Sequence, residues 1–186
     1  MQIVSDITRI SLQRFKEKDV RCASLRTPIG MVLVSVSDYG VCNVSVIDNS
    51  NTEFLKRSLW STSVFQGNDC AVEDVIYELN EYFFGARQHF TVAVDLRVVT
   101  EFTLRVLRVT QSIRFGEVLS YSDVARKIGS PKACRAVGRA LSRNPVPIIV
   151  PCHRVVSHGG CLGGFTLGRL SKSTLLQLEG HTKLKK

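Results

Sequence analysis

The chain has 186 residues, of which 44% are hydrophobic and 22% charged, so it can build a core as one large domain or two small ones. Its apolar runs fall short of the roughly 18 residues that a membrane span needs. The charges within its first 19 residues are unlike a secretory signal. We therefore expect a cytoplasmic protein, or a nuclear one if the source is eukaryotic, with no membrane partner.

The net charge of +9 lies almost entirely in the second half of the chain. Residues 1–100 hold 10 Lys and Arg against 12 Asp and Glu, a balance of −2, whereas residues 101–186 hold 15 against 4, a balance of +11. A near-neutral half followed by a basic half indicates two domains, the second with a polyanionic partner. A basic surface that is merely solvated is the alternative.

Six cysteines and four histidines are scattered along the chain. They form no Cys-x-x-Cys pair and show no zinc spacing, so we expect no metal and no cofactor. A disulfide scaffold is not expected in a chain that can build its own core.

Residues 1–97 are predicted to form a small α/β domain with a structural role. Extended runs and turn residues alternate through Arg21–Asp48, which predicts an antiparallel meander of three strands. Apolar residues recur three and four apart from Val72 to Phe83, which predicts a helix that ends near Gly85. We further expect a short helix around Phe54–Leu59 and a strand over Phe90–Leu96.

Residues 98–181 are predicted to form a mainly helical domain, followed by a basic tail at 182–186. An apolar stripe from Phe102 to Ile113 predicts its first helix. Ser120 and Asp123 have the spacing of a capping box, which predicts that a second, short helix begins there.

Ser130 and Pro131 are expected to restart a helix at once, with serine as the cap and proline in the first turn. Two short helices joined by about two residues predict a helix-turn-helix, although any tight helical corner looks similar. The second of these helices is rich in cations: Lys132, Arg135, Arg139 and Arg143.

Cys152 and His153 are the strongest candidates for chemistry, within the sequence Pro-Cys-His-Arg. Three polar or reactive side chains in a row rarely enter a core without a function. Ionised cysteine is a soft nucleophile, and a histidine base can activate it. Because neighbouring side chains on an extended backbone point to opposite faces, we expect a water to connect the two. A buried structural thiol is the alternative, and a papain-type protease does not fit, because its histidine lies far from its cysteine in sequence.

Glu179 is the one acid of the second half that is not assigned to a linker, turn or cap. It shares a helical face with Leu175 and Leu176, and a carboxylate on an apolar face needs a partner. That partner is either His153, whose tautomer it would fix, or an arginine such as Arg154 in a structural ion pair. The spacing of these residues in the sequence does not decide between the two partners.

Four segments together resemble the methylated-DNA–protein-cysteine methyltransferases, also called 6-O-alkylguanine-DNA alkyltransferases. The resemblance is dense from Phe102 to His181 and looser over Arg21–Leu96. It implies a ribonuclease-H-like N-terminal domain and a C-terminal domain with a winged-helix-like helix-turn-helix. The four segments are Phe115–Tyr121, Arg135–Gly138, Asn144–Pro147 and Val150–Val155.

The resemblance also implies a reaction. Such a protein binds double-stranded DNA as a monomer and flips 6-O-alkylguanine, or 4-O-alkylthymine, out of the stack. Cys152 then takes the alkyl group in one irreversible step, so each molecule acts once. His153 is implied as the base, acting through water, and Glu179 as the group that orients it. Asn144 matches the residue that shapes the turn before the cysteine.

The family's DNA contacts can be carried over position by position. Arg135 is implied to fill the gap left by the flipped base, and Tyr121 to help rotate the nucleotide and polarise the base. The implied DNA-binding set is Arg135, Tyr121, Ser130, Lys132, Ala133 and Arg139. The implied base pocket is Val155, Phe165, Thr166 and Leu167.

Two positions depart from the family pattern. Leu167 replaces a glycine and is expected to narrow the base pocket, which disfavours bulky adducts. Arg139 stands where a small residue is usual and is expected to add a phosphate contact. Two other functions remain possible at this stage: a lesion binder without repair activity, although such relatives lack the cysteine, and a helix-turn-helix regulator with an incidental thiol.

Overall fold

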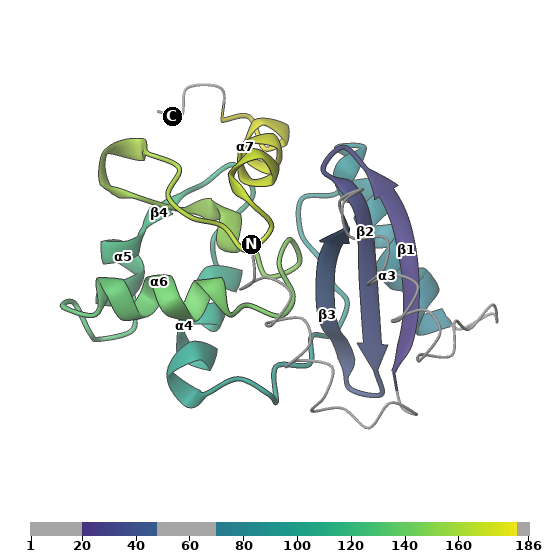
Figure 1. Cartoon of the computed structure of the whole chain (residues 1–186), viewed down its shortest axis with the longest axis horizontal. Coiled ribbons are helices and arrows are strands. Elements are labelled where there is room, and N and C mark those ends of the chain that lie inside the picture. Colours follow the sequence, from purple (N-terminus) through teal and green to yellow (C-terminus); the bar gives the residue numbers. More distant parts are fainter. Residues whose placement is uncertain (1–19, 48–69, 182–186) are drawn as a thin grey trace. The chain divides into compact units, whose positions relative to one another are not determined.

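The computed structural model describes residues 20–47 and 70–181, and Figure 1 shows their helices and strands. The helix expected around Phe54–Leu59 and the basic tail at 182–186 lie outside the described residues. The contacts divide the chain into two units, Met1–Val98 and Val99–Lys186, which are described separately below.

The described part of the first unit begins with a three-stranded antiparallel sheet, as the meander pattern predicted. Its strands are β1 (Arg21–Thr27), β2 (Gly30–Ser37) and β3 (Gly40–Ile47), hydrogen-bonded in the order β1-β2-β3. Side chains from the middle strand, including Val32 and Val34, are fully buried. A helix covers the sheet, since α3 (Cys70–Phe83) packs on β1 and β2 through a buried face that includes Val75, Leu79 and Tyr82.

The strand expected over Phe90–Leu96 is wrong. Only Val94 forms a bridge, beside Val41 of β3. The reason lies in a buried carboxylate: Glu78 of α3 accepts hydrogen bonds from the backbone N–H of Thr91, at 2.8 Å, and from its hydroxyl. Because the Thr91 N–H is bound by a side chain, pairing with β3 is limited to the bridge at Val94, where the N–H of Val41 donates to the carbonyl of Ala93 and the N–H of Asp95 to the carbonyl of Val41, both at 2.8 Å.

The second unit is mainly helical, as predicted. Its first two helices are α4 (Glu101–Gln111) and α5 (Tyr121–Lys127), and the capping box between Ser120 and Asp123 is present at the start of α5. The remaining helices are α6 (Cys134–Ser142) and α7 (Arg169–Leu178). Two short parallel strands, β4 (Leu119–Ser120) and β5 (Val155–Val156), connect the start of α5 to the segment that follows Cys152.

The turn between α5 and α6 differs from the expectation. Helix α6 begins at Cys134 and its N-cap is Ala133, so Ser130 does not cap it. Residues 130–133 instead form a turn, closed by the N–H of Ala133 donating to the carbonyl of Ser130 at 2.9 Å. Proline favours the second position of such a turn, which explains why Pro131 delays the helix.

The described residues include no helix that is both long and apolar enough to cross a membrane.

We predict that Gly40→Ala destabilises the first unit strongly, whereas Gly85→Ala does so only mildly. Both glycines have positive φ, 123° and 76°, but an added Cβ overlaps the Ala93 carbonyl only at Gly40 and meets nothing within 4 Å at Gly85. We expect a loss of about 3 kcal/mol or more for Gly40→Ala and about 1 kcal/mol for Gly85→Ala. Denaturant unfolding followed by circular dichroism measures both, and equal losses would contradict the close packing of Gly40 against Ala93.

Candidate active site

Cys152, His153 and Arg154 form one turn of 3-10 helix, η2, rather than the extended run assumed from the sequence. Pro151 precedes this turn, and its carbonyl accepts the N–H of Arg154 at 3.0 Å. All three side chains are buried, with 4%, 0% and 5% of their surface exposed. A tight turn therefore sends three adjacent side chains into the protein interior.

Asn144 fixes the loop that leads to the cysteine. Its buried amide donates to the carbonyl of Val150 at 3.0 Å and to Sγ of Cys152 at 3.1 Å, and its oxygen accepts the N–H of Val146 at 3.1 Å. Within this loop Ile148 is fully buried with φ 76°, a conformation that a β-branched residue rarely adopts. The amide thus holds together a loop that would not keep this shape by local preference.

Burial dominates the electrostatics of the thiol. It raises the pKa of Cys152 to about 11, although the hydrogen bond from Asn144 and the charge of Lys172 act in the opposite direction. In this conformation the sulfur therefore carries its proton at neutral pH, and reaction requires a base.

His153 and Glu179 form a buried pair in which the charge lies on the carboxylate. Glu179 is the C-cap of α7, and its Oε1 lies 2.8 Å from Nε2 of His153. Burial raises the pKa of Glu179, but hydrogen bonds from His153 and Arg154 outweigh it and bring that pKa to about 2. Burial lowers the pKa of His153. Because a carboxylate only accepts, the imidazole proton belongs on Nε2 and the basic lone pair on Nδ1.

Arg154 binds the same carboxylate. Its Nε donates to Oε2 of Glu179 at 2.8 Å and one terminal nitrogen donates to Oε1 at 2.9 Å. The other terminal nitrogen donates to the carbonyl of Ile113 at 2.6 Å. The two partners that spacing left open for Glu179, the histidine and an arginine, are therefore both present.

Lys172 is a buried cation beside the site that sequence reasoning missed. It is fully buried, and its Nζ donates to the carbonyl of Val155 at 2.6 Å and of Gly164 at 3.1 Å. Burial lowers its pKa to about 8. Lys172 precedes Leu175 and Leu176 by three and four residues, so the helical-face argument that singled out Glu179 could also have found it.

Tyr121 lies at the edge of this cluster. Its hydroxyl donates to the carbonyl of Gly164 at 3.5 Å, and its ring lies 3.8 Å from where a Cβ on Gly138 would stand. Gly163 has φ 64°, and a side chain there would contact the tyrosine hydroxyl. Burial raises the pKa of Tyr121, so its phenol is a hydrogen-bond donor at neutral pH.

The residues expected to form the base pocket are spread around the cluster. Val155 is fully buried, and the rings of Phe165 and His153 form a T-shaped contact with their centroids 6.1 Å apart. Thr166 donates to the carbonyl of Leu141 at 3.3 Å, and Leu167 is half-buried in the loop before α7.

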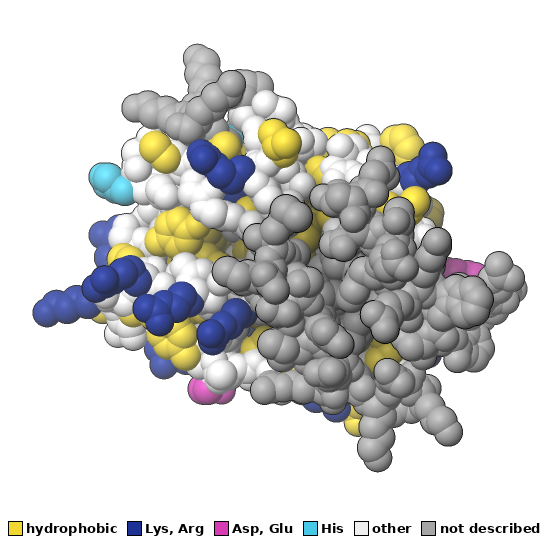
Figure 2. Space-filling model, viewed as in Figure 1, with side chains coloured by type: hydrophobic (Ala, Val, Ile, Leu, Met, Phe, Trp, Pro, Cys, Tyr) yellow, Lys and Arg dark blue, Asp and Glu magenta, His cyan; other side chains and the backbone are white. Residues whose placement is uncertain are grey.

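Apart from Tyr121 at the start of α5, the residues expected to bind DNA lie on α6 and in the turn before it. Lys132, Arg135 and Arg139 are exposed, whereas Ser130 and Ala133 are half-buried. Figure 2 shows Lys and Arg side chains gathered over the α5 and α6 region of the second unit. The arrangement offers a basic helical surface outside the buried cluster.

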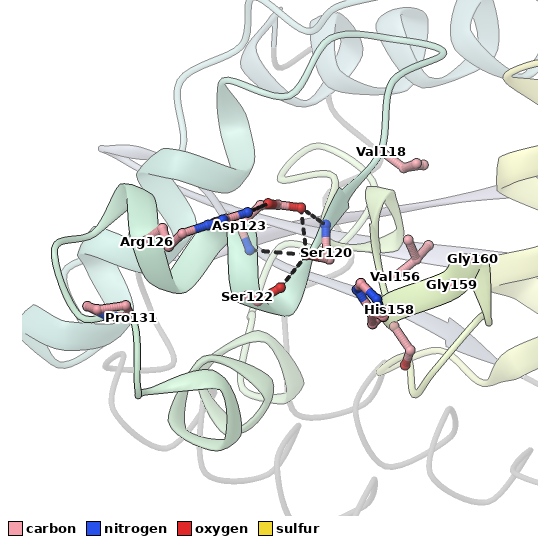
Figure 3. Close-up of a pocket in the computed structure, with 11 residues that line it drawn as sticks. Val118, Ser120, Ser122, Asp123, Arg126, Pro131, Val156, His158, Gly159 and Gly160 are labelled. Carbon is pink, nitrogen blue, oxygen red and sulfur yellow. Dashed lines mark hydrogen bonds and ion pairs between the residues drawn. The ribbon is translucent and has the colours of Figure 1, made fainter.

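A cavity of about 520 Å³ lies elsewhere in the second unit, at the start of α5. Figure 3 shows Ser120, Ser122 and Asp123 on its α5 side and His158 on the side of the loop after β5. Neither Cys152 nor His153 lines this cavity, so it is not the expected base pocket. Within residues 20–47 and 70–181, no group of three or more His, Cys, Asp or Glu could hold a metal ion.

The fold and the site together are those of a protein that combines a basic helical pair with a buried cysteine, histidine and glutamate. Residues 101–181 match the family model described as the 6-O-methylguanine DNA methyltransferase, DNA binding domain. The chain is 36% identical to the methylated-DNA–protein-cysteine methyltransferase of Mycobacterium leprae, over 89% of this chain and 95% of that protein. It is 32% identical to the human protein of that name, over 89% and 83%.

Solved structures of O6-methylguanine methyltransferases are also similar to this chain. The Mycobacterium tuberculosis O6-methylguanine methyltransferase is similar with a TM-score of 0.71 and 33% identity, over 90% of this chain and 96% of that one. A Mycobacterium tuberculosis structure in complex with DNA is similar with a TM-score of 0.72 and 35% identity, over 86% and 91%. The chain belongs to the methylated-DNA–protein-cysteine methyltransferase family.

We predict that Lys172→Met makes the Cys152 thiol less reactive. Losing a buried cation that favours the thiolate raises the thiol pKa, so alkylation by iodoacetamide at pH 8 slows by about ten-fold. Mass spectrometry of the Cys152 peptide measures the rate, with the exposed Cys161 as an internal control. Lys172→Arg keeps the charge and should slow the reaction less; equal slowing in both variants would contradict an electrostatic effect.

Proposed function

We propose that Cys152 is the residue that receives the alkyl group when this methylated-DNA–protein-cysteine methyltransferase repairs DNA. The substrate is duplex DNA with an alkyl group on the 6-oxygen of guanine, and 4-O-alkylthymine is a second substrate. The observation that carries the proposal is a buried sulfur, 3.1 Å from the Asn144 amide, beside a His153–Glu179 pair joined at 2.8 Å. This arrangement supplies a nucleophile, a base and an orienting carboxylate.

The proton of the thiol is the first obstacle to reaction. With a thiol pKa of about 11, on the order of one molecule in 10⁴ carries a thiolate at pH 7. Nδ1 of His153 takes this proton through a water, while Glu179 holds the proton on Nε2 and stabilises the imidazolium that forms. The base is therefore oriented before substrate arrives.

The transfer is one displacement at saturated carbon. The electron pair of sulfur forms the new S–C bond as the C–O bond breaks, and its electrons remain on the guanine, which then takes up a proton. The phenol of Tyr121 donates a hydrogen bond to the leaving base and favours that charge. The product is a thioether that water does not reverse, so each protein molecule acts once.

Access to the sulfur requires base flipping, because the alkylated oxygen lies inside the duplex. Arg135 fills the gap in the stack, and exposed Lys132 and Arg139 contact phosphates together with Ser130 and Ala133. Since only 4% of Cys152 is exposed, part of the surrounding chain moves as the base enters, and we assign this movement to the loop of Phe165, Thr166 and Leu167.

Finer features of the fold belong to the same proposal. The sheet and α3 form a ribonuclease-H-like N-terminal domain, and the second unit is a winged-helix-like DNA-binding and alkyl-acceptor domain. The protein acts as a monomer where its DNA lies, in the cytoplasm or the nucleus. The basic helical surface of the second unit supports its assignment as the DNA-binding domain, since phosphate neutralisation dominates DNA affinity.

The test is transfer of a methyl group to Cys152. After incubation with duplex DNA containing 6-O-methylguanine, the Cys152 peptide should gain one methyl group by mass spectrometry, and Cys152→Ala should keep lesion binding while losing transfer. The exposed Cys161 should remain unmodified. Retained lesion binding without methylation would instead indicate a non-repairing binder, and sequence-specific binding that ignores alkylation would indicate a regulator.

Leu167 is predicted to disfavour large adducts. Leu167→Gly should raise the ratio of benzyl to methyl transfer by about ten-fold, because it removes side-chain volume from the proposed pocket. Single-turnover rates on duplexes with either lesion give the ratio. Leu170, whose side chain is 86% exposed, provides the control Leu170→Gly, and an unchanged ratio in Leu167→Gly would overturn the hypothesis.

A further inference from the structure

Both oxygens of the Glu179 carboxylate are occupied. Oε1 lies 2.8 Å from Nε2 of His153 and accepts a terminal nitrogen of Arg154 at 2.9 Å. Oε2 accepts Nε of Arg154 at 2.8 Å and the N–H of Gly116 at 3.4 Å. The imidazole and a guanidinium therefore share one carboxylate oxygen.

Arg154 cannot easily leave this position. It is 5% exposed, and its remaining terminal nitrogen donates to the carbonyl of Ile113 at 2.6 Å. Its guanidinium also lies 5.9 Å from the centre of the Phe115 ring. A planar group held by a carboxylate on one side and a carbonyl on the other keeps a single orientation.

We propose that Arg154 is a positioning residue that keeps His153 neutral, and so able to accept the thiol proton, by sharing the carboxylate of Glu179. The inference rests on the proposed function, in which His153 is the base.

The argument is one of charge balance in a buried site. With Arg154 bound, Glu179 and Arg154 already neutralise each other, so a proton on His153 adds an unbalanced buried charge. Without Arg154, the carboxylate and an imidazolium form a balanced pair, and His153 would hold a proton before the reaction starts. A base that is already protonated cannot take the proton of Cys152.

The other groups around His153 are consistent with this role. Burial lowers the pKa of His153, Glu179 raises it, and the charges of Arg154 and Lys172 lower it. Cys152 is protonated at neutral pH, since its pKa is about 11, and the Phe165 ring is uncharged. Arg154 therefore acts on His153 both directly and through Glu179.

This charge balance predicts how the transfer rate depends on pH when Arg154 is removed. A neutral His153 is the active form, so the transfer rate falls as pH drops through its pKa. Removing Arg154 raises that pKa, and the acidic limb of the pH–rate profile should move up by about one pH unit. A purely structural role would lower stability and the rate at every pH alike.

The experiment uses single-turnover transfer from duplex DNA containing 6-O-methylguanine between pH 5.5 and 8.5. Arg154→Met should shift the acidic limb upward, and Arg154→Lys, which keeps a cation, should restore most of the wild-type profile. Arg105→Met is the matched control, because Arg105 also donates to a backbone carbonyl, that of Ile128, and it is not among the hydrogen-bond partners of Glu179 given above. The inference is overturned if Arg154→Met and wild type have the same limb.

A second measurement does not depend on transfer. Imidazole NMR gives the pKa of His153 directly, in the wild type, in Arg154→Lys and in the Glu179→Gln background, where Arg154→Met leaves no buried carboxylate unpaired. Arg154→Met should raise this pKa less in Glu179→Gln than in the native background, and the Glu179→Gln background with and without Arg154→Met gives the comparison if Arg154→Met alone does not fold. If the wild type transfers no methyl group, the proposed function fails; if it does but His153 titrates alike with and without Arg154, only the inference fails.

Discussion

The buried carboxylate of Glu179 is the constraint on which the second unit depends. Glu179 is the C-cap of α7. Its partners are His153 and Arg154 of η2 and Gly116 in the segment after α4, so one carboxylate connects three stretches of the chain. A buried carboxylate is tolerated only when its oxygens are paired. Here hydrogen bonds outweigh burial and hold its pKa near 2. The group that anchors the fold is thus also the one that orients the proposed base.

The same burial that makes this anchor strong makes the cysteine inert at rest. Desolvation raises the pKa of the Cys152 thiol, and the Asn144 amide and the Lys172 charge only partly offset it. A protein that can react once gains from a thiol that stays protonated until substrate and base are in place. In the proposed mechanism, reactivity then depends on the relay and on opening the site, and a permanently exposed thiolate is not needed.

The carbonyl of Gly164 connects the buried site to the loop expected to admit the base. It accepts hydrogen bonds from Tyr121 and from Lys172, which belong to α5 and α7. A movement of this loop would therefore change the surroundings of two groups at once. One is the phenol of Tyr121, the proposed hydrogen-bond donor to the leaving base, and the other is the cation of Lys172 beside the thiol. In the proposed mechanism, these shared contacts link movement of the loop to the surroundings of Cys152.

Local signals in the sequence determined much of this protein: the meander, α3, α4 and the capping box of α5 follow from periodicity and turn chemistry, and the Pro-Cys-His-Arg run marked the cysteine. Two local predictions were wrong because distant or competing groups decided them. Glu78 binds the N–H of Thr91 at the start of Phe90–Leu96, which was expected to be a strand, and the turn at Pro131 delays α6. Spacing placed Glu179 on a buried face but could not choose its partner. Only the tertiary structure brought His153 and Arg154, 26 and 25 residues away, to one carboxylate, because contacts between segments depend on packing and not on sequence separation.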